Sequence, residues 1–132
     1  MASIRLEVPF KASADKVWDV VRDVGAVHTR FTPGFVTDCR LDGEEARIVT
    51  FANGFVAREL IVDVNDRFRR LAYSVVGSER MSHHNASFQV EPDGKGARMI
   101  WIADILPNDA EPTIRGLMEQ GAAAMRKAID GA

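Results

Sequence analysis

The chain has 132 residues, of which 46% are hydrophobic and 27% are charged, and its formal net charge is −2 at pH 7. This length suits one domain with a single core, so we expect one domain over residues 1–132. The near-neutral charge argues against binding to nucleic acid or to an anionic membrane surface. The single cysteine, Cys39, excludes an intramolecular disulfide and a cysteine-based zinc site.

The chain shows no sign of a targeting or membrane segment. Its first ten residues, MASIRLEVPF, lack an apolar run of signal-peptide length, and no stretch approaches the ~18 apolar residues of a membrane span. We therefore expect a cytoplasmic protein with no membrane insertion.

The first elements are a strand and two short helices. Ile4, Leu6, Val8 and Phe10 alternate with other residues, which predicts a strand with one buried face. Pro9 cannot donate to a ladder and places the end of this strand at an edge or a bulge. A helix is predicted over residues 14–24, capped by Ser13, and a second helical piece over residues 26–31.

From residue 35 to residue 106 the pattern alternates between strands and turns. The turn signals are Asp42-Gly43, Asn53-Gly54, Asn65-Asp66, Gly77-Ser78 and Pro92-Asp93-Gly94. They delimit strands at 35–41, 47–52, 55–64, 71–76, 82–90 and 97–106. Strands joined by such short connections form an antiparallel meander.

The last segment, residues 109–130, is predicted to be one long helix. Its apolar residues recur at steps of three and four, with Asp109 as a candidate N-cap and Gly131 at the expected stop. The face is unusually small because it includes Gly116 and Gly121, and a mid-helix glycine costs roughly 1 kcal/mol relative to alanine. Such glycines indicate either close approach to the sheet or space left for a guest.

Several stretches together resemble a known superfamily. They are SADKVWDVVRDV after the opening strand, the turn FANGFVARELIVDV followed by RRLAYSV, the strand ASFQVEPDGKGARMIW, and the closing helix. In this order the chain resembles the START-like superfamily, also called Bet v 1-like or SRPBCC, and within it the polyketide cyclase/dehydrase group of small bacterial proteins. The resemblance implies an α+β helix-grip fold, in which a seven-stranded curved antiparallel sheet wraps around the long helix. It also implies a cavity for apolar ligands between sheet and helix.

Alternation then assigns the side chains that face the cavity. For the strand beginning at Phe55 the more apolar set is taken as inward: Val56, Arg58, Leu60, Val62 and Val64. The inward sets of the later strands are Leu71, Tyr73 and Val75; His84, Ala86, Phe88 and Val90; and Met99, Trp101, Ala103 and Ile105. Arg47, Val49 and Phe51 form a more ambiguous set, and one bulge would reverse any assignment.

The candidate ligand-binding residues follow from these faces. They are Arg47, Arg58, Tyr73, His84 and Trp101, with Phe31 in a suspected lid and Met118 on the long helix. An arginine can hold a carboxylate or enolate oxygen with two hydrogen bonds. His84 can exchange a proton near neutral pH, and Tyr73 can donate to a carbonyl, so both are candidate catalytic residues.

Each candidate also has a purely structural explanation. Either arginine can reach solvent at the rim of the sheet or pair with a glutamate, and Tyr73 can be a core ring. Adjacent residues on a strand face opposite ways, so His83 and His84 cannot share a metal ion, and we expect neither metal nor cofactor. No nucleophile motif and no glycine-rich phosphate loop is present.

Three functions remain open at this point. The first is a carrier or sensor that binds a small, largely apolar molecule. The second is a cyclase, dehydratase or isomerase acting on a hydrophobic or polyketide-like substrate, with Tyr73 or His84 as acid or base. The third is a protein-interaction module without an open cavity. Ile100 and Ile102 give the outer face of the last strand an apolar character that would suit a homodimer.

Overall fold

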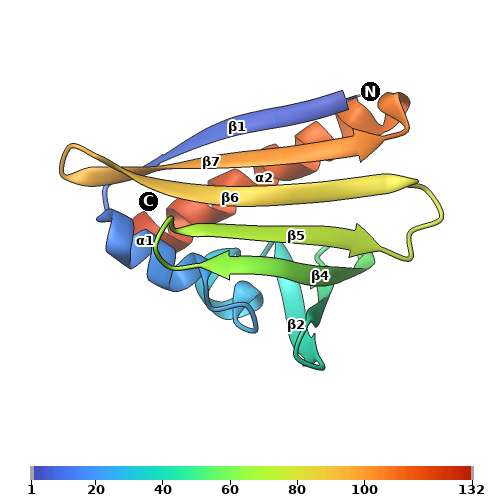
Figure 1. Ribbon diagram of the computed structural model, residues 1–132, viewed down its shortest axis with the longest axis horizontal. Coiled ribbons are helices and arrows are strands. Elements are labelled where there is room, and N and C mark those ends of the chain that lie inside the picture. The colour runs from blue at the N-terminus through green and yellow to red at the C-terminus, as the bar shows by residue number, and fades with distance from the viewer. Residues whose placement is uncertain (1, 132) are drawn as a thin grey trace.

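The computed structural model describes residues 2–131 and shows a curved antiparallel sheet that folds around one side of a long helix (Figure 1). The strands are β1 (Ala2–Phe10), β2 (Val36–Asp42), β3 (Ala46–Phe51), β4 (Val56–Asn65), β5 (Arg70–Val76), β6 (His83–Asp93) and β7 (Gly96–Leu106). Their order across the sheet is β1-β7-β6-β5-β4-β3-β2. This arrangement confirms the predicted meander, with the first strand added beside the last.

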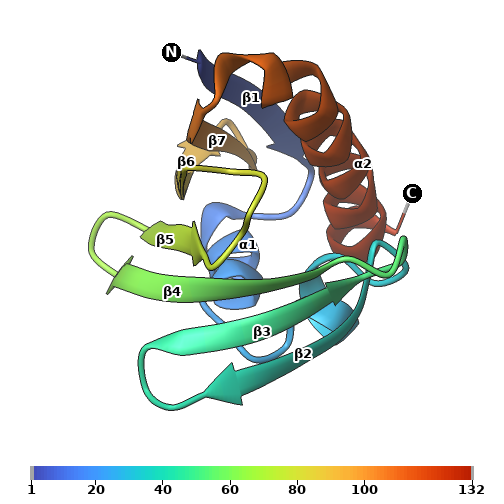
Figure 2. The ribbon, with the colours of Figure 1, turned by 90° about the vertical axis from the view of Figure 1, so that its right-hand side faces the viewer.

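Strands β1 and β2 form the two edges of the sheet. β1 pairs with β7 along its whole length, from Ala2 opposite Ile105 to Phe10 opposite Ala97. Pro9 therefore sits on an edge strand, where its missing N–H costs no ladder hydrogen bond, as predicted. The curvature carries β2 and β3 far from β1, and α2 lies on the concave side (Figure 2).

The helices are α1 (Ala14–Val21), the π-helix η1 (Val27–Phe31), the 3₁₀ turn η2 (Asn108–Ala110) and α2 (Glu111–Asp130). Ser13 caps α1 as predicted, because its side-chain oxygen accepts a 3.3 Å hydrogen bond from the Lys16 amide. Asp109 does not cap α2, since it lies within the 3₁₀ turn that precedes it. Gly131 ends α2 in the left-handed conformation, with φ at 74°.

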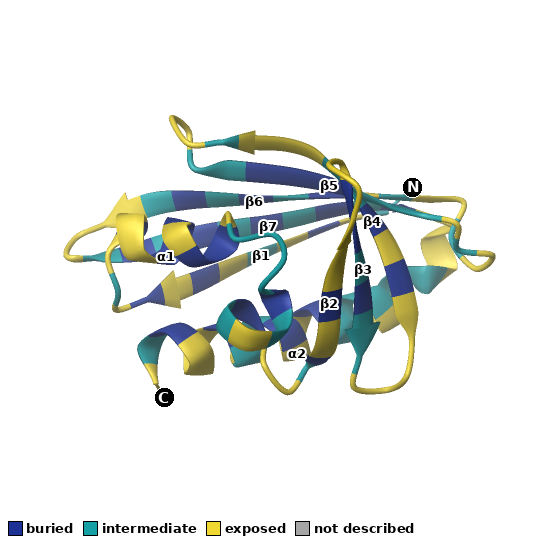
Figure 3. Ribbon diagram, turned by 90° about the horizontal axis from the view of Figure 1, so that it is seen from below, coloured by how far each residue is buried: buried dark blue, intermediate teal, exposed yellow. Residues whose placement is uncertain are grey.

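The alternation predicted for β6 and β7 is confirmed, and these strands supply much of the core. Ala86, Phe88 and Val90 are buried on β6, as are Met99, Trp101, Ala103 and Ile105 on β7. Buried and exposed bands alternate along the strands (Figure 3). The outward residues Ile100 and Ile102 are only half-buried. No helix in residues 2–131 is both long enough and apolar enough to cross a membrane.

The inward face predicted for β4 is wrong over most of the strand. Ala57 and Glu59 are buried, whereas Val56 and Val62 are 56% and 62% exposed. A shift of register between Ile61 and Asp63 marks a bulge, so the two halves of β4 turn opposite sets of residues inward. Beyond the bulge, Val64 lies opposite the buried Leu71. Even there Val64 is 37% exposed, so most of the apolar set chosen for the inward face is exposed, and apolarity alone did not identify the buried face of β4.

Candidate functional site: a cavity under the first half of α2

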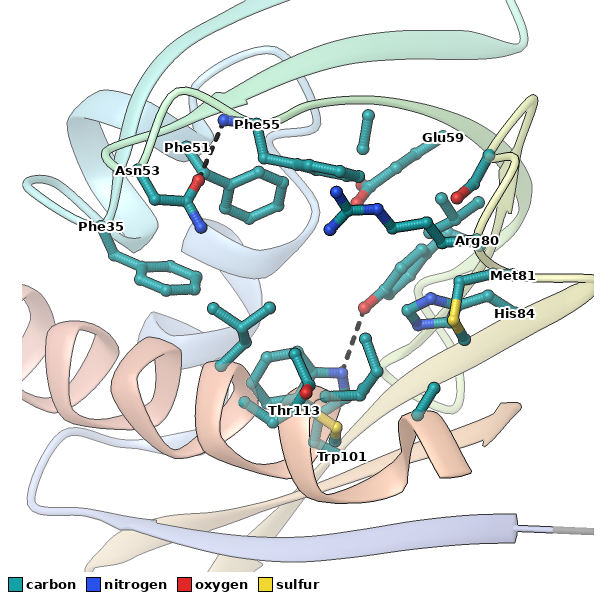
Figure 4. A pocket seen from close by; sticks show the side chains of 18 residues that line it. Phe35, Phe51, Asn53, Phe55, Glu59, Arg80, Met81, His84, Trp101 and Thr113 are labelled. Carbon is teal, nitrogen blue, oxygen red and sulfur yellow. Dashed lines mark hydrogen bonds between the residues drawn. The ribbon is translucent and has the colours of Figure 1, made fainter. Parts of the chain in front are cut away.

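A cavity of about 330 Å³ lies between the first half of α2 and the concave face of the sheet (Figure 4). Its walls come from the segment before β2, the β3–β4 hairpin, β5, the β5–β6 connection, β6, β7 and α2. The lining residues are Phe35, Phe51, Asn53, Phe55, Ala57, Glu59, Tyr73, Val75, Ser78, Arg80, Met81, His84, Trp101, Ala110, Thr113, Ile114, Leu117 and Met118. A cavity of this size is at the lower end of the range for drug-sized ligands.

Aromatic side chains make up one side of the cavity. The rings of Phe35 and Phe51 meet edge to face with centroids 5.4 Å apart, and Phe55 lies 6.5 Å from Phe51. The hairpin turn positions two of them, since Phe51 ends β3 and Phe55 follows the Asn53-Gly54 turn. Such rings offer a guest large, rigid apolar contacts.

Tyr73 and Trp101 place a hydrogen-bonding pair within this apolar lining. The Trp101 indole N–H donates to the Tyr73 hydroxyl oxygen at 3.2 Å, and both residues line the cavity. Burial, assisted by the nearby Glu59 carboxylate, raises the pKa of Tyr73 far above its ordinary value of 10.0. The phenol therefore keeps its proton at any physiological pH and can donate a hydrogen bond to a guest.

Glu59 and Arg47 form a buried ion pair behind the tyrosine. The Arg47 Nε donates to Glu59 Oε1 at 2.8 Å, and the two side chains are only 4% and 9% exposed. Arg47 also donates to the Val24 carbonyl at 3.2 Å, and its guanidinium lies 5.8 Å from the centre of the Tyr73 ring. Glu59 lines the cavity but Arg47 does not. The pair therefore puts a carboxylate in the wall whose charge is already balanced.

His84 lines the cavity from β6 and is half-buried. Burial lowers the pKa of His84 below its ordinary value of 6.5, and the opposing effect of the Glu59 carboxylate does not restore it. Its imidazole is therefore neutral at pH 7 and offers one donor and one acceptor. The preceding residue, His83, is exposed, as expected for neighbours on a strand.

Arg80 is the cationic residue of the lining. It lies in the connection between β5 and β6, is exposed, and makes no salt bridge with any carboxylate in residues 2–131. Its guanidinium extends across the cavity toward the side that holds Phe55 (Figure 4). The Arg80 guanidinium can therefore pair with an anionic group of a ligand at the mouth of the cavity, where the cavity opens to solvent.

The structure gathers some of the predicted residues and separates others. Tyr73, His84, Trp101 and Met118 all line the cavity. Arg47 faces inward as predicted, but its guanidinium is paired with the Glu59 carboxylate behind the cavity wall. Phe31 is buried and packs edge to face on Phe88 with centroids 5.3 Å apart, outside the lining.

The inward placement of Arg58 is wrong. Arg58 lies on the outer face of β4, where its Nε donates to Asp42 Oδ2 at 3.0 Å, and its side chain is 46% exposed. The cause is the wrong choice of face on β4, before the bulge. An exposed pair of this kind contributes at most about 1 kcal/mol to stability.

Sequence reasoning missed two charged residues of the site. The Asn53-Gly54 turn signals that β3 and β4 pair, but a two-residue turn there would place Arg47 opposite Leu60, whereas the strands pair with Arg47 opposite Glu59. Arg80 gave no such signal, since the path of a connecting segment is not fixed by periodicity. Within residues 2–131, no three His, Cys, Asp or Glu side chains cluster closely enough to hold a metal ion.

The family model described as "Polyketide cyclase / dehydrase and lipid transport" matches residues 1–131. The chain belongs to this family. Its fold and family indicate a protein that binds a hydrophobic ligand or resembles a polyketide cyclase. A comparison with curated proteins gives no match.

Solved structures place the fold among START-like and Bet v 1-like proteins. An uncharacterized protein from Bacillus thuringiensis superposes with a TM-score of 0.86 at 16% identity, over 97% of this chain and 98% of the other. A START superfamily protein from Mycobacterium smegmatis gives 0.75 at 15% identity, over 98% and 94%. Norcoclaurine synthase from Thalictrum flavum gives 0.73 at 21% identity, over 96% and 91%. At these identities the likeness confirms the predicted helix-grip fold.

Proposed function

We propose that the protein binds a small, largely apolar molecule in the cavity under the first half of α2, as a carrier or a sensor. The observation that supports this most is the lining itself, in which aromatic and aliphatic side chains surround a few polar groups. Ligand sites typically combine an apolar wall with a small number of polar groups that orient the guest. A module that only packs its helix on its sheet would have no need for this space.

The test is a titration with the neutral fluorescent probe N-phenyl-1-naphthylamine. Ala57 is buried on β4 and lines the cavity, so Ala57→Leu adds a larger side chain to the space that the probe needs. We expect probe affinity to fall about tenfold or more, in line with the cost of overpacking. The matched control is Ala123→Leu, on an exposed position of α2 outside the cavity.

The proposal fails if the wild-type protein does not bind the probe, or if Ala57→Leu and Ala123→Leu bind it equally well. In the second case the probe would be held by exposed apolar side chains such as Val62 or Phe68. Thermal unfolding of both variants provides the folding control. The larger side chain at residue 57 enters existing space, so a normal melting transition should be retained.

A second candidate function is an enzyme of the cyclase, dehydratase or isomerase type. It is favoured by Tyr73, His84 and Glu59 lining one cavity, because a neutral imidazole that can accept a proton and a phenol that can donate a hydrogen bond to a carbonyl suit acid–base chemistry. Among the related folds, norcoclaurine synthase has been solved in complex with dopamine and hydroxybenzaldehyde. That enzyme shows only that this fold can hold aromatic reactants.

The two functions differ in what happens to the guest. Native mass spectrometry of protein purified from its own host would reveal a co-purifying molecule, and incubation would show whether its mass or retention time changes. For an enzyme, Tyr73→Phe and His84→Gln should stop the conversion while the guest still binds. A guest recovered unchanged from the wild-type protein would favour carriage or sensing.

A further inference from the structure

Charge at the cavity suggests which class of guest it holds, and this step rests on the binding function proposed above. The charged side chains in the lining are Glu59 and Arg80. The Glu59 carboxylate is balanced by the Arg47 guanidinium 2.8 Å away, just behind the wall. His84 is neutral at pH 7, because burial lowers its pKa, and Tyr73 keeps its proton. The site therefore carries one uncompensated positive charge, on Arg80.

The other arginines provide a reference for Arg80. Eight of them, Arg5, Arg22, Arg30, Arg47, Arg58, Arg69, Arg98 and Arg115, pair with a carboxylate. Arg80 has no such partner among residues 2–131, and neither have Arg40, Arg67, Arg70 and Arg126, but of these five only Arg80 lines the apolar cavity. A guanidinium presents a planar fork of donors that matches a carboxylate, and partial desolvation by neighbouring apolar groups strengthens the pair.

The direction of the Arg80 side chain fixes how a guest would lie. It comes from the β5–β6 connection and extends over the cavity, while Trp101 lies at the opposite wall near α2 (Figure 4). A guest with an anionic head at Arg80 would therefore place its body among Phe51, Phe55 and Trp101. A second hollow, lined by Val76, Gly77 and Glu79, shares Phe55 and Arg80 with the cavity and leaves the head accessible to water.

We propose that the guest is an amphiphilic monocarboxylate, whose anionic head pairs with Arg80 at the mouth while its apolar body fills the cavity. This assigns to Arg80 the anchoring role that the sequence pattern had suggested for Arg58. A single negative charge matches the single free positive charge. A dianionic head would leave one charge unpaired, and a cationic head would face Arg80 directly.

The experiment compares two guests that share an apolar body. Both 2-naphthaleneacetate and 2-naphthaleneethanol are titrated against protein preloaded with N-phenyl-1-naphthylamine, at pH 7.5. We expect the carboxylate to displace the probe at about tenfold lower concentration than the alcohol, which is the effect of one charge-assisted hydrogen bond at its lower limit. The advantage should shrink as salt is raised, because Arg80 is exposed, whereas the affinity of the alcohol should not.

Variants then assign the preference to one side chain. In Arg80→Gln the carboxylate should lose its advantage while the alcohol binds as in the wild type. Arg80→Lys keeps the charge and should keep part of the preference. The matched control is Arg126→Gln, which removes an exposed arginine on α2 that pairs with no carboxylate among residues 2–131 and lies outside the cavity.

Equal affinities of the two guests for the wild-type protein would overturn the inference, as would a preference that survives in Arg80→Gln. Either result leaves the proposed function standing, because the neutral probe and the alcohol still bind. If neither the probe nor the two guests bind, the binding function and the inference fail together. A preference lost equally in Arg80→Gln and Arg126→Gln would mean long-range charge rather than pairing, and would also contradict it.

Discussion

The two halves of α2 do different things, although they belong to one continuous helix. The first half supplies Thr113, Ile114, Leu117 and Met118 to the cavity wall. The second half packs tightly, with Gly121, Met125 and Ile129 buried. Figure 2 shows the helix crossing the concave side of the sheet. The second half therefore contributes only to the core, whereas the first half forms a wall of the cavity and joins the core through Met118, which is 4% exposed.

The two glycines of α2 differ in their surroundings. A Cβ on Gly121 would lie 3.2 Å from ring atoms of both Phe35 and Trp101, so this glycine allows close packing against side chains of the sheet. Apart from its chain neighbours and its own helix backbone, a Cβ on Gly116 would meet no heavy atom of residues 2–131 within 4 Å, but Gly116 does not line the cavity. The close approach that the sequence left as one alternative therefore occurs at Gly121, whereas the open space at Gly116 is not the space of the cavity.

Breaking the buried ion pair should have the largest effect on stability. Arg47→Ala leaves the Glu59 carboxylate buried without its partner, which we expect to cost about 3–5 kcal/mol in the free energy of unfolding. Chemical denaturation of the wild type and the variant measures this loss in the free energy of unfolding. The double variant Arg47→Met with Glu59→Leu removes both charges and should recover most of the loss. A loss below about 1 kcal/mol for the single variant would contradict the burial of this pair.

Truncation at matched positions tests the two halves of α2 directly. Met125 is 1% exposed, so Met125→Ala should cost about 2–5 kcal/mol through lost burial and a new cavity. Leu117 borders space that is already open, so Leu117→Ala creates no new cavity and should cost only about 1 kcal/mol. Denaturation of both variants gives the comparison. Equal losses would show that the two halves pack alike.

The two glycines provide a smaller but more specific test. Gly116→Ala should raise the free energy of unfolding by up to about 1 kcal/mol, because alanine is the better helix former and its methyl group meets nothing. Gly121→Ala gains the same propensity, but Phe35 and Trp101 must move to admit the methyl group, so its gain should be smaller or negative. If Gly121→Ala proves the more stable variant, the second half is not closely packed.

The smallest expected effect is a pH dependence from His84. Its folded-state pKa lies below the ordinary value of 6.5, so the unfolded chain binds more protons as the pH falls through 6.5. Stability due to the neutral imidazole is therefore present above that pH and is lost as the pH drops toward the folded-state value. Denaturation between pH 7.5 and 5 should show a shallower decline for His84→Gln than for the wild type. Parallel profiles would mean that His84 is solvated.

The elements of this fold were predictable because their signals are local. Turn dipeptides such as Asn53-Gly54 marked the strand ends, and a spacing of three and four residues marked α2. The cavity was predictable only in part. Tyr73, His84 and Trp101 lie on strands whose alternation is regular, whereas Arg58 was misplaced because the more apolar alternate set of β4, which includes Val56 and Val62, is mostly exposed. Arg80 was missed because the course of a connection depends on tertiary packing.

The central claim is that an open, ligand-accessible cavity lies under the first half of α2 and not under the second. A crystal structure of the protein soaked with N-phenyl-1-naphthylamine tests it most directly. We predict density for the probe among Tyr73, Trp101 and Leu117, with Met125 still packed as in the free protein. Side chains that fill this space, or a probe bound only on the outer face of the sheet, would contradict the account.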